Sequence, residues 1–254
     1  MLSCPSGILA KFTAFFFLAA LVLATPVVRA EEAASADADE ATMKTAMDAF
    51  RAEFKGDEDA KSGALEKLAE VKHAKIFGVL GGVLMSKDSE VVRSVAARML
   101  GSYHDKRTVP HLLKAFEVAK KDTAVLGKII TALGEIGDES AAEPLGKHAV
   151  SKGPNLDKKS IEAVQACVDT LGKLKAKSGI EDLIKLGEAL GGMSNMDTEK
   201  LGMRNELINR CIASLKVITG EDLKADDASK IILEYKKWWK ANQKTWDPAK
   251  KKSS

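Results

Sequence analysis

One helical pattern occurs five times along the chain, and this repetition limits the fold more than any other feature. Each copy has a small or medium apolar residue, a Leu four places later and a further apolar residue three places after that. Offsets of four and seven return to the same side of a helix, so each copy marks one apolar helix face. The anchor leucines are 32, 33, 38 and 44 residues apart. The five copies are Ala64/Leu68/Val71, Ala96/Leu100/Tyr103, Ile129/Leu133/Ile136, Cys167/Leu171/Leu174 and Cys211/Leu215/Ile218.

A second apolar-periodic segment follows each copy after a short polar break. Neither helix of such a pair can bury its apolar face alone, whereas stacking one pair on the next buries both. The low aromatic content, 5%, also favours helices over strands. The sequence therefore predicts an all-α fold, an α-solenoid of about five antiparallel helix pairs with N- and C-terminal capping helices. The second segments are 76–84, 109–116, 142–149, 180–190 and 231–239.

Glycine follows the anchor leucine directly in three of the copies, at Gly101, Gly134 and Gly172. A position without a side chain lets neighbouring helices approach closely, at a cost of about 1 kcal/mol of helix propensity relative to Ala. We expect close helix–helix packing at these three positions.

The segments 88–101 and 132–145 resemble bacterial HEAT repeats of the short, phycobilisome-lyase-like kind, which are armadillo-type α-solenoids. The resemblance covers about residues 57–246 and is weakest in the last unit, where Lys216 takes the place of the Gly. Segments 215–220 and 236–242 are similar to the end of many secreted bacterial HEAT-repeat proteins. The resemblance implies a solenoid that binds other macromolecules, and it implies no chemistry.

The first thirty residues have the pattern of a secretory signal peptide. Lys11 precedes an apolar run over 12–24, and Val28-Arg29-Ala30 places small or apolar residues at the positions that a signal peptidase reads. The run of 13 residues is shorter than the roughly 20 that span a bilayer as a helix. We expect cleavage and export to the periplasm or the extracellular space; the alternative is an uncleaved N-terminal anchor.

The rest of the chain divides by composition. Segment 31–41 is rich in Ala, Glu, Asp and Ser and is expected to be a flexible acidic linker. An N-terminal capping helix is expected at 42–56, the HEAT-like repeats at 57–223, a C-terminal partner or capping helix at 224–246, and a basic tail at 247–254. The formal net charge of +3 is too small to imply nucleic-acid binding, so no nucleic-acid partner is expected.

Motifs for catalysis, metals and cofactors are not found. None of the four histidines, His73, His104, His111 and His148, has the spacing of a metal site, and we expect them to be solvated or to cap helices. The sequence contains neither a Gly-rich phosphate loop nor a Gly-x-Ser-x-Gly elbow. The acidic pairs 138–139, 181–182 and 226–227 are expected to cap helix starts. No catalytic residues, metal or cofactor are therefore expected, and the protein is not expected to be an enzyme.

Cys167 and Cys211 occupy the same place in successive units. The equivalent residues of the other units are Ala or Ile, which favours buried core thiols. Equivalent positions in stacked helices lie about 10 Å apart, farther than the roughly 7 Å between Cα atoms that a disulfide allows. A Cys167–Cys211 disulfide is the alternative.

A column of lysines is the first candidate for partner binding. Lys114, Lys147 and Lys185 each lie thirteen residues after one of the three glycines. In HEAT-like stacks the second helices line the concave surface, where such a ladder would bind an acidic peptide or a polyanion. Alternatively, Glu143 and Glu181 pair with lysines four residues later and leave a solvated, largely neutral helix face.

The C-terminal segment is the second candidate, because Trp238 and Trp239 lie among the lysines of 236–240. Basic residues interleaved with aromatics bind nucleic acid or anionic membrane surfaces. The helical spacing of Ile231, Tyr235 and Trp238 equally predicts an amphipathic cap over the last repeat.

The function predicted from these patterns is that of a non-enzymatic, exported scaffold which binds a protein or peptide through its concave helix row. The alternative is an envelope-surface or polyanion-binding protein that contacts membranes through the Lys/Trp segment, and an enzyme with its active site in the concavity is the least favoured.

Overall fold

The computed structural model describes residues 38–247, and within this range the chain is helical without β-strands. The predicted signal peptide, most of the acidic linker and all of the basic tail but Asp247 lie outside the described residues. None of the described helices is both long and apolar enough to cross a membrane.

Within residues 38–247, eleven α-helices form a cap and five helix pairs. The cap is α2 (Glu40–Glu53). The first helices of the pairs are α3 (Glu58–Ala69), α5 (Glu90–Ser102), α7 (Thr123–Ile136), α9 (Lys158–Leu174) and α11 (Thr198–Thr219). The second helices are α4 (Ala74–Leu84), α6 (Val109–Val118), α8 (Ala142–Lys152), α10 (Lys177–Gly191) and α12 (Ala228–Asn242). Four short 3-10 helices, η1 (Lys106–Thr108), η2 (Ala119–Lys121), η3 (Glu139–Ala141) and η4 (Gly153–Asn155), lie in the connections.

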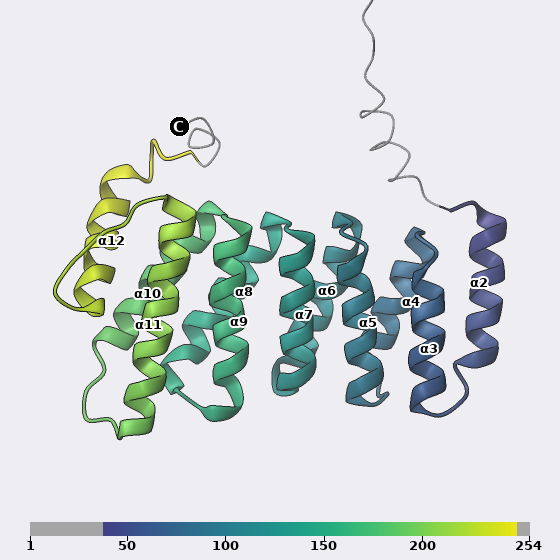
Figure 1. The fold of residues 1–254 in the computed structure, drawn as a ribbon. Helices are drawn as coiled ribbons and strands as arrows, with labels where there is room; N and C mark the ends of the chain where they lie inside the picture. Colours follow the sequence, from purple (N-terminus) through teal and green to yellow (C-terminus); the bar gives the residue numbers. More distant parts are fainter. Residues whose placement is uncertain (1–37, 248–254) are drawn as a thin grey trace, which may run out of the picture. The chain divides into compact units, whose positions relative to one another are not determined.

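The pairs stack in chain order into two rows. Figure 1 shows the first-helix row, α3 to α11, in front with α2 at its end, and α4, α6, α8 and α10 behind it. We call α4, α6, α8, α10 and α12 the second-helix row. The predicted all-α solenoid of five helix pairs is confirmed. The five anchor leucines, Leu68, Leu100, Leu133, Leu171 and Leu215, are each at most 1% exposed.

Side-chain caps define where most helices begin. Asp57 accepts a hydrogen bond from the backbone N–H of Ala60 at 2.9 Å, which satisfies a donor without an intrahelical partner. Asp39 caps α2 in the same way, so Glu40 and Ala41, expected in the linker, form the first turn of this helix. Eight of the described helices, α2, α3, α4, α5, α7, α9, α11 and α12, have such a cap, from Asp39, Asp57, His73, Ser89, Asp122, Asp157, Asp197 and Asp227.

The three glycines of the first helices are sites of close approach, as predicted. A Cβ atom added at Gly101 would lie 2.8 Å from the Cβ and 2.9 Å from the Cα atom of Ala132 on the next first helix. Helices α5 and α7 therefore pack almost backbone to backbone at this position. The equivalent contacts are Gly134 with Thr170 (3.2 Å) and Gly172 with Ser214 (2.8 Å), and in the second-helix row Gly81 with His111, Gly146 with Asp182 and Gly187 with Ile232.

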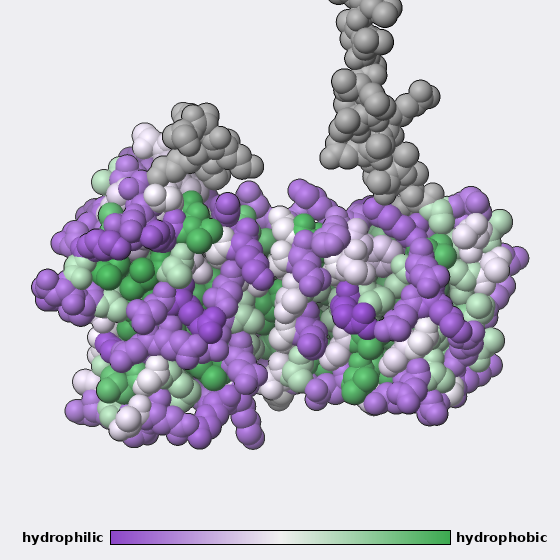
Figure 2. Space-filling view, viewed as in Figure 1, coloured by the Kyte–Doolittle hydropathy of each residue, from purple (hydrophilic) through white to green (hydrophobic). Residues whose placement is uncertain are grey.

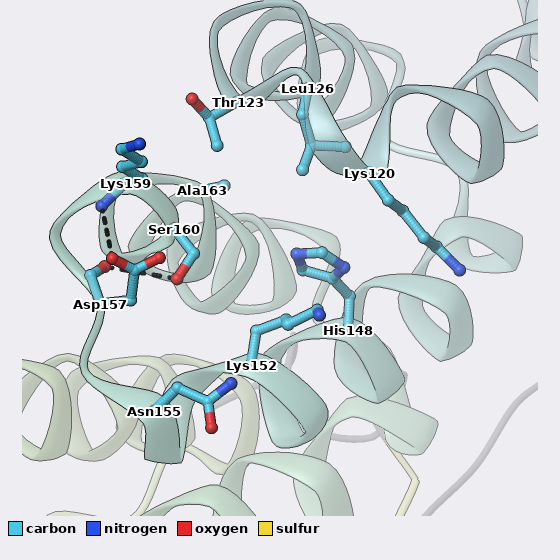
Figure 3. Close-up of a pocket in the computed structure, with 10 residues that line it drawn as sticks. All are labelled: Lys120, Thr123, Leu126, His148, Lys152, Asn155, Asp157, Lys159, Ser160 and Ala163. Atoms are coloured by element: carbon cyan, nitrogen blue, oxygen red, sulfur yellow. Dashed lines mark hydrogen bonds between the residues drawn. The ribbon is translucent and has the colours of Figure 1, made fainter.

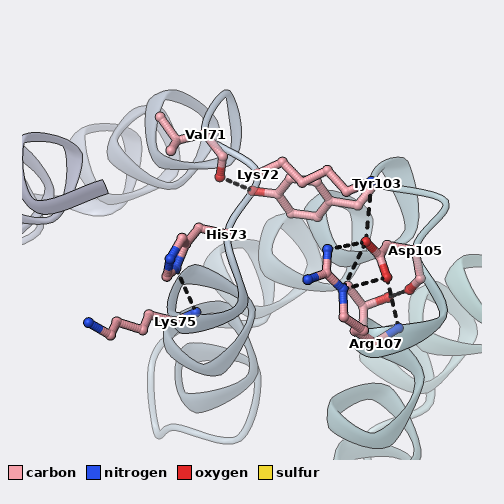
Figure 4. A network of polar contacts seen from close by, with 8 residues as sticks. Val71, Lys72, His73, Lys75, Tyr103, Asp105 and Arg107 are labelled. Atoms are coloured by element: carbon pink, nitrogen blue, oxygen red, sulfur yellow. Dashed lines mark hydrogen bonds and ion pairs between the residues drawn. The ribbon is translucent and has the colours of Figure 1, made fainter. Parts of the chain in front are cut away.

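Polar contacts tie the loop after α3 to the loop after α5 (Figure 4). The hydroxyl of Tyr103 donates to the backbone oxygen of Val71 at 3.1 Å. Asp105 binds Lys72 at 3.2 Å and Arg107 at 2.7 Å, and its side chain is only 11% exposed. These cations, Arg107 foremost, hold the pKa of the Asp105 carboxyl well below its usual range.

Cys167 and Cys211 are both free thiols that are 0% exposed. Desolvation raises the pKa of each thiol, so both stay protonated near neutral pH. The prediction of buried core thiols is confirmed, and the alternative disulfide between them is not formed.

We expect Gly101→Ala to lower the free energy of unfolding by about 1–2 kcal/mol, because overpacking against the Ala132 backbone outweighs the gain in helix propensity. Urea unfolding followed by circular dichroism measures the change. Gly127→Ala is the matched control, since no atom of another helix lies within 4 Å of its added Cβ, and it should stabilise the protein by about 0.5–1 kcal/mol. Equal effects of the two substitutions would contradict close packing at Gly101.

The Asp105 network should make stability depend on acid pH. Because the pKa of Asp105 is lower in the folded state, its stabilisation is present above the unfolded pKa of about 4 and is lost as pH falls through the folded pKa. Asp105 also caps η1 by accepting a hydrogen bond from the backbone N–H of Arg107 at 2.9 Å, which an Asn can still do. We expect Asp105→Asn to cost about 1–2 kcal/mol at pH 7 and to flatten the acid dependence. Asp48→Asn removes an exposed ion pair with Arg51 and should change stability by less than about 0.5 kcal/mol. An unchanged acid profile in Asp105→Asn would disprove the role of this carboxylate.

Candidate partner-binding site

The predicted lysine ladder lies on exposed faces of the second-helix row, and two of its three members are paired. Lys147 on α8 binds Glu143 at 2.5 Å, and Lys185 on α10 binds Glu181 at 2.8 Å. These carboxylates raise the pKa of both lysines. Lys114 on α6 is exposed and forms no ion pair with another described residue. The ladder thus offers one open ammonium group and two that are already neutralised.

The acidic pair 181–182 does not cap a helix, which corrects the sequence prediction. Both residues lie inside α10, which begins at Lys177. Asp182 instead packs against Gly146 of α8, and burial raises the pKa of its carboxyl. The other two acidic pairs do cap helix starts: Asp138 accepts from Ser140 in η3, and Asp227 accepts from Lys230 in α12.

The C-terminal tryptophans are packed into the end of the stack. Trp239 is 9% exposed and stacks on Trp238, with ring centroids 6.2 Å apart. Trp246 meets the Trp239 ring edge-on at 5.9 Å, and the ammonium of Lys177 lies 5.7 Å from the centre of that ring. Tyr235, 1% exposed, donates from its hydroxyl to the backbone oxygen of Glu221 at 2.6 Å. Helix α12 therefore covers the last repeat as the predicted amphipathic cap.

A hollow of about 340 Å³ lies between α10 and α12 and brings two of the predicted site residues together. Ile184 and Trp239 supply its apolar surface, and Lys185 stands beside it. Lys114 and Lys147 are outside this hollow, and Trp238 does not line it. We call it the α10–α12 hollow; its lining is Glu181, Ile184, Lys185, Glu188, Lys236, Trp239, Lys240 and Gln243.

Charges around the α10–α12 hollow are mostly paired. Lys236 of α12 binds Glu188 of α10 at 2.6 Å, which also holds the two helices together. Lys240 has no ion pair with another described residue and is exposed. The hollow thus combines apolar surface with an open ammonium group, an arrangement suited to an apolar side chain next to a carboxylate.

The opposite face, formed by the first helices, offers no comparable apolar surface. Figure 2 shows it as mainly hydrophilic, with apolar patches that are small and separate. Its exposed large apolar residues, such as Val91 on α5 and Leu201 and Val217 on α11, are scattered, which is normal for a protein surface.

Sequence reasoning missed the α10–α12 hollow because Ile184 and Trp239 lie 55 residues apart in the chain. It also misplaced His148, which is 7% exposed and neither solvated nor a cap, since burial against the ring of Phe116 was not visible in the spacing. His73 does cap a helix, accepting from the backbone N–H of Lys75 at 3.1 Å. Within residues 38–247, no three His, Cys, Asp or Glu side chains are grouped closely enough to hold a metal ion.

Comparison with known proteins relates part of the chain to a family of repeats. The family model of HEAT repeats matches residues 79–165, which run from within α4 into α9. No curated protein matches the chain. Residues 79–165 are therefore similar to HEAT repeats, helical scaffolds that commonly mediate protein interactions, and the pairs on either side of this segment continue the same stacking.

Proposed function

We propose that this protein is a non-enzymatic scaffold that binds a protein or peptide partner along its second-helix row, with the α10–α12 hollow as the anchoring point. The observation that carries this proposal is the hollow itself, in which apolar surface from Ile184 and Trp239 adjoins the lysines at positions 185, 236 and 240. Interfaces of this kind gain affinity from buried aromatic anchors and selectivity from complementary charges.

The partner that fits best is a segment with an apolar or aromatic side chain flanked by Asp or Glu. Its apolar side chain would cover Trp239, and a carboxylate would reach Lys240. Lys185 and Lys236 are already paired with Glu181 and Glu188. They would therefore orient the bound segment through hydrogen bonds more than attract it by net charge. Lys114 and Lys147 lie on neighbouring helices of the same row, where a longer acidic partner would extend.

The polyanion and membrane alternative has less support, because it requires aromatic side chains free to insert. Trp239 is 9% exposed, and the indole nitrogen of Trp246 is buried. We further propose that the protein acts after export, in the periplasm or outside the cell, because segment 1–30 has the composition of a signal peptide.

Selection of a random peptide library on the protein tests the α10–α12 hollow. The enriched peptides should combine an aromatic or aliphatic residue with Asp or Glu, and their binding should change the intrinsic fluorescence. All three tryptophans of the chain, Trp238, Trp239 and Trp246, lie at this end of the stack, so the signal is local. We expect Lys185→Glu combined with Lys240→Glu to weaken these peptides about tenfold.

Lys128→Glu combined with Lys173→Glu is the matched control, because it makes the same charge change on the first-helix row and should leave binding within about twofold. Peptides that bind both double variants equally, or bind without a fluorescence change, would refute the hollow as anchor. Reversal of Lys114, Lys147 and Lys185 to Glu tests the wider row: if it weakens no selected peptide or partner, the row is not the binding surface.

A further inference from the structure

A second hollow, of about 310 Å³, lies at the edge of the stack where α8 ends and α9 begins, and we call it the turn hollow. Figure 3 shows its lining side chains coming from α7, α8, α9 and the connecting turns. Basic and hydroxyl groups predominate; those used below are Lys120, Thr123, His148, Lys152 and Lys159, with one carboxylate from Asp157.

His148 gives this hollow its main chemical feature. His148 is only 7% exposed, and its Nε2 atom is buried without a hydrogen-bond partner among the described residues. Figure 3 shows the imidazole pointing into the space between α7, α8 and α9. On its other side the ring packs edge-on against Phe116, with centroids 5.3 Å apart. A buried polar atom without a partner is costly, so a group that forms a hydrogen bond with this atom would stabilise the protein.

The charges around the imidazole are unequally engaged. Lys120 is held by an ion pair with Glu117 of α6. Asp157 is directed to its own helix, where it accepts a hydrogen bond from the backbone N–H of Lys159 at 3.3 Å. Lys152 and the Lys159 side chain form no ion pair with another described residue, although both are exposed beside the hollow. The open ammonium group of Lys152 thus lies near an unpartnered imidazole, and Lys159 lies on the far side of the hollow.

The turn that closes this hollow has a fixed geometry. It falls in the 38-residue spacing from Leu133 to Leu171, five residues longer than the spacing before it. Leu156 in this turn is 2% exposed with a positive φ of 45°, an unfavourable conformation that its buried side chain holds in place. A Cβ at Gly153 would lie 2.5 Å from Leu186, so the turn sits tightly on α10. The insertion therefore forms a rigid wall.

We propose that the turn hollow binds a divalent oxyanion of the phosphate or sulfate class, with the ammonium of Lys152 and the Nε2–H group of His148 as its principal donors. Lys159 and the hydroxyl of Thr123 complete the site at its mouth. Charge-assisted hydrogen bonds of this kind are about twice as strong as neutral ones. The group is either a free ion or the phosphate of a phosphorylated serine, and both carry the same two charges and acceptor oxygens.

The protonation of His148 follows from the same arrangement. Burial, then the charges of Lys120 and Lys152, lower the pKa of its imidazole, while Glu117 acts in the opposite direction. Across the hollow, Lys159 adds positive charge and Asp157 negative charge. A bound dianion places two negative charges beside the ring and favours the imidazolium form. Binding of the anion is therefore linked to uptake of a proton, whereas a water molecule in the same place would not raise the pKa.

Sulfate is the sharpest probe, since it keeps both charges throughout the range in which His148 titrates. The full chain is titrated with sulfate at constant ionic strength while the imidazole signals are followed by nuclear magnetic resonance. We expect saturable shifts of His148, a rise of its pKa by about one unit, and tighter binding as pH falls. Inorganic phosphate and a phosphoserine peptide, with its serine counterpart, distinguish the free ion from the phosphorylated side chain as the source.

Lys152→Gln removes one donor without touching the core, because Lys152 is exposed, and should weaken sulfate about tenfold. Lys128→Gln is the matched control on α7 and should leave the affinity unchanged. His148→Gln should abolish the pH dependence of sulfate binding. If this variant unfolds, the comparison of Lys152→Gln with Lys128→Gln alone decides. No saturation at His148, or equal sulfate affinity in Lys152→Gln and Lys128→Gln, would overturn the proposal. Its failure leaves the α10–α12 hollow unaffected, because the two sites share no residue.

Discussion

The missing Cβ atoms of Gly101, Gly134 and Gly172 set the distance between consecutive first helices, and other features of the stack depend on that distance. With the helix backbones this close, the anchor leucines that precede these glycines, Leu100, Leu133 and Leu171, are fully buried. At the Gly101 junction, the loops after α5 and α7 are then near enough for Lys106 to bind Asp138 at 3.5 Å. A similar ion pair joins Lys72 to Asp105 one unit earlier, where Ala69 follows the anchor leucine in place of a glycine. Close packing thus also positions the polar contacts between units.

Repetition made much of this architecture predictable. A pattern at offsets of four and seven identifies a buried helix face without any knowledge of the neighbours, so the five pairs, the glycine contacts and the capping role of Trp239 all followed from the sequence. The pairing of Lys147 with Glu143 was predictable as well, because both residues lie on one turn of one helix. The sequence was a sufficient guide wherever the interacting residues are local or recur with the repeat.

Prediction failed where the surroundings of a residue are set by a different helix, because the spacing within its own helix does not reveal them. Asp182 was assigned to a helix start, but it lies against Gly146 of the preceding second helix. His148 was assigned to the surface or to a cap, but it packs against the ring of Phe116 and is buried. Both hollows have the same origin: one forms at the inserted turn and the other where the cap replaces a further repeat. In a chain built of similar units, the irregular spacing in the sequence is the best guide to where distinctive chemistry is placed.

The buried thiols of Cys167 and Cys211 have a consequence for the dynamics of the stack. They lie at equivalent positions of α9 and α11, and each helix pair packs mainly against its immediate neighbours. In such an array, separation of one junction does not require the remaining junctions to open. A thiol-alkylating reagent can reach these sulfur atoms only during such an event, so its rate of reaction measures how often the C-terminal half of the array opens locally. The protein thereby carries two native reporters of local opening in its interior.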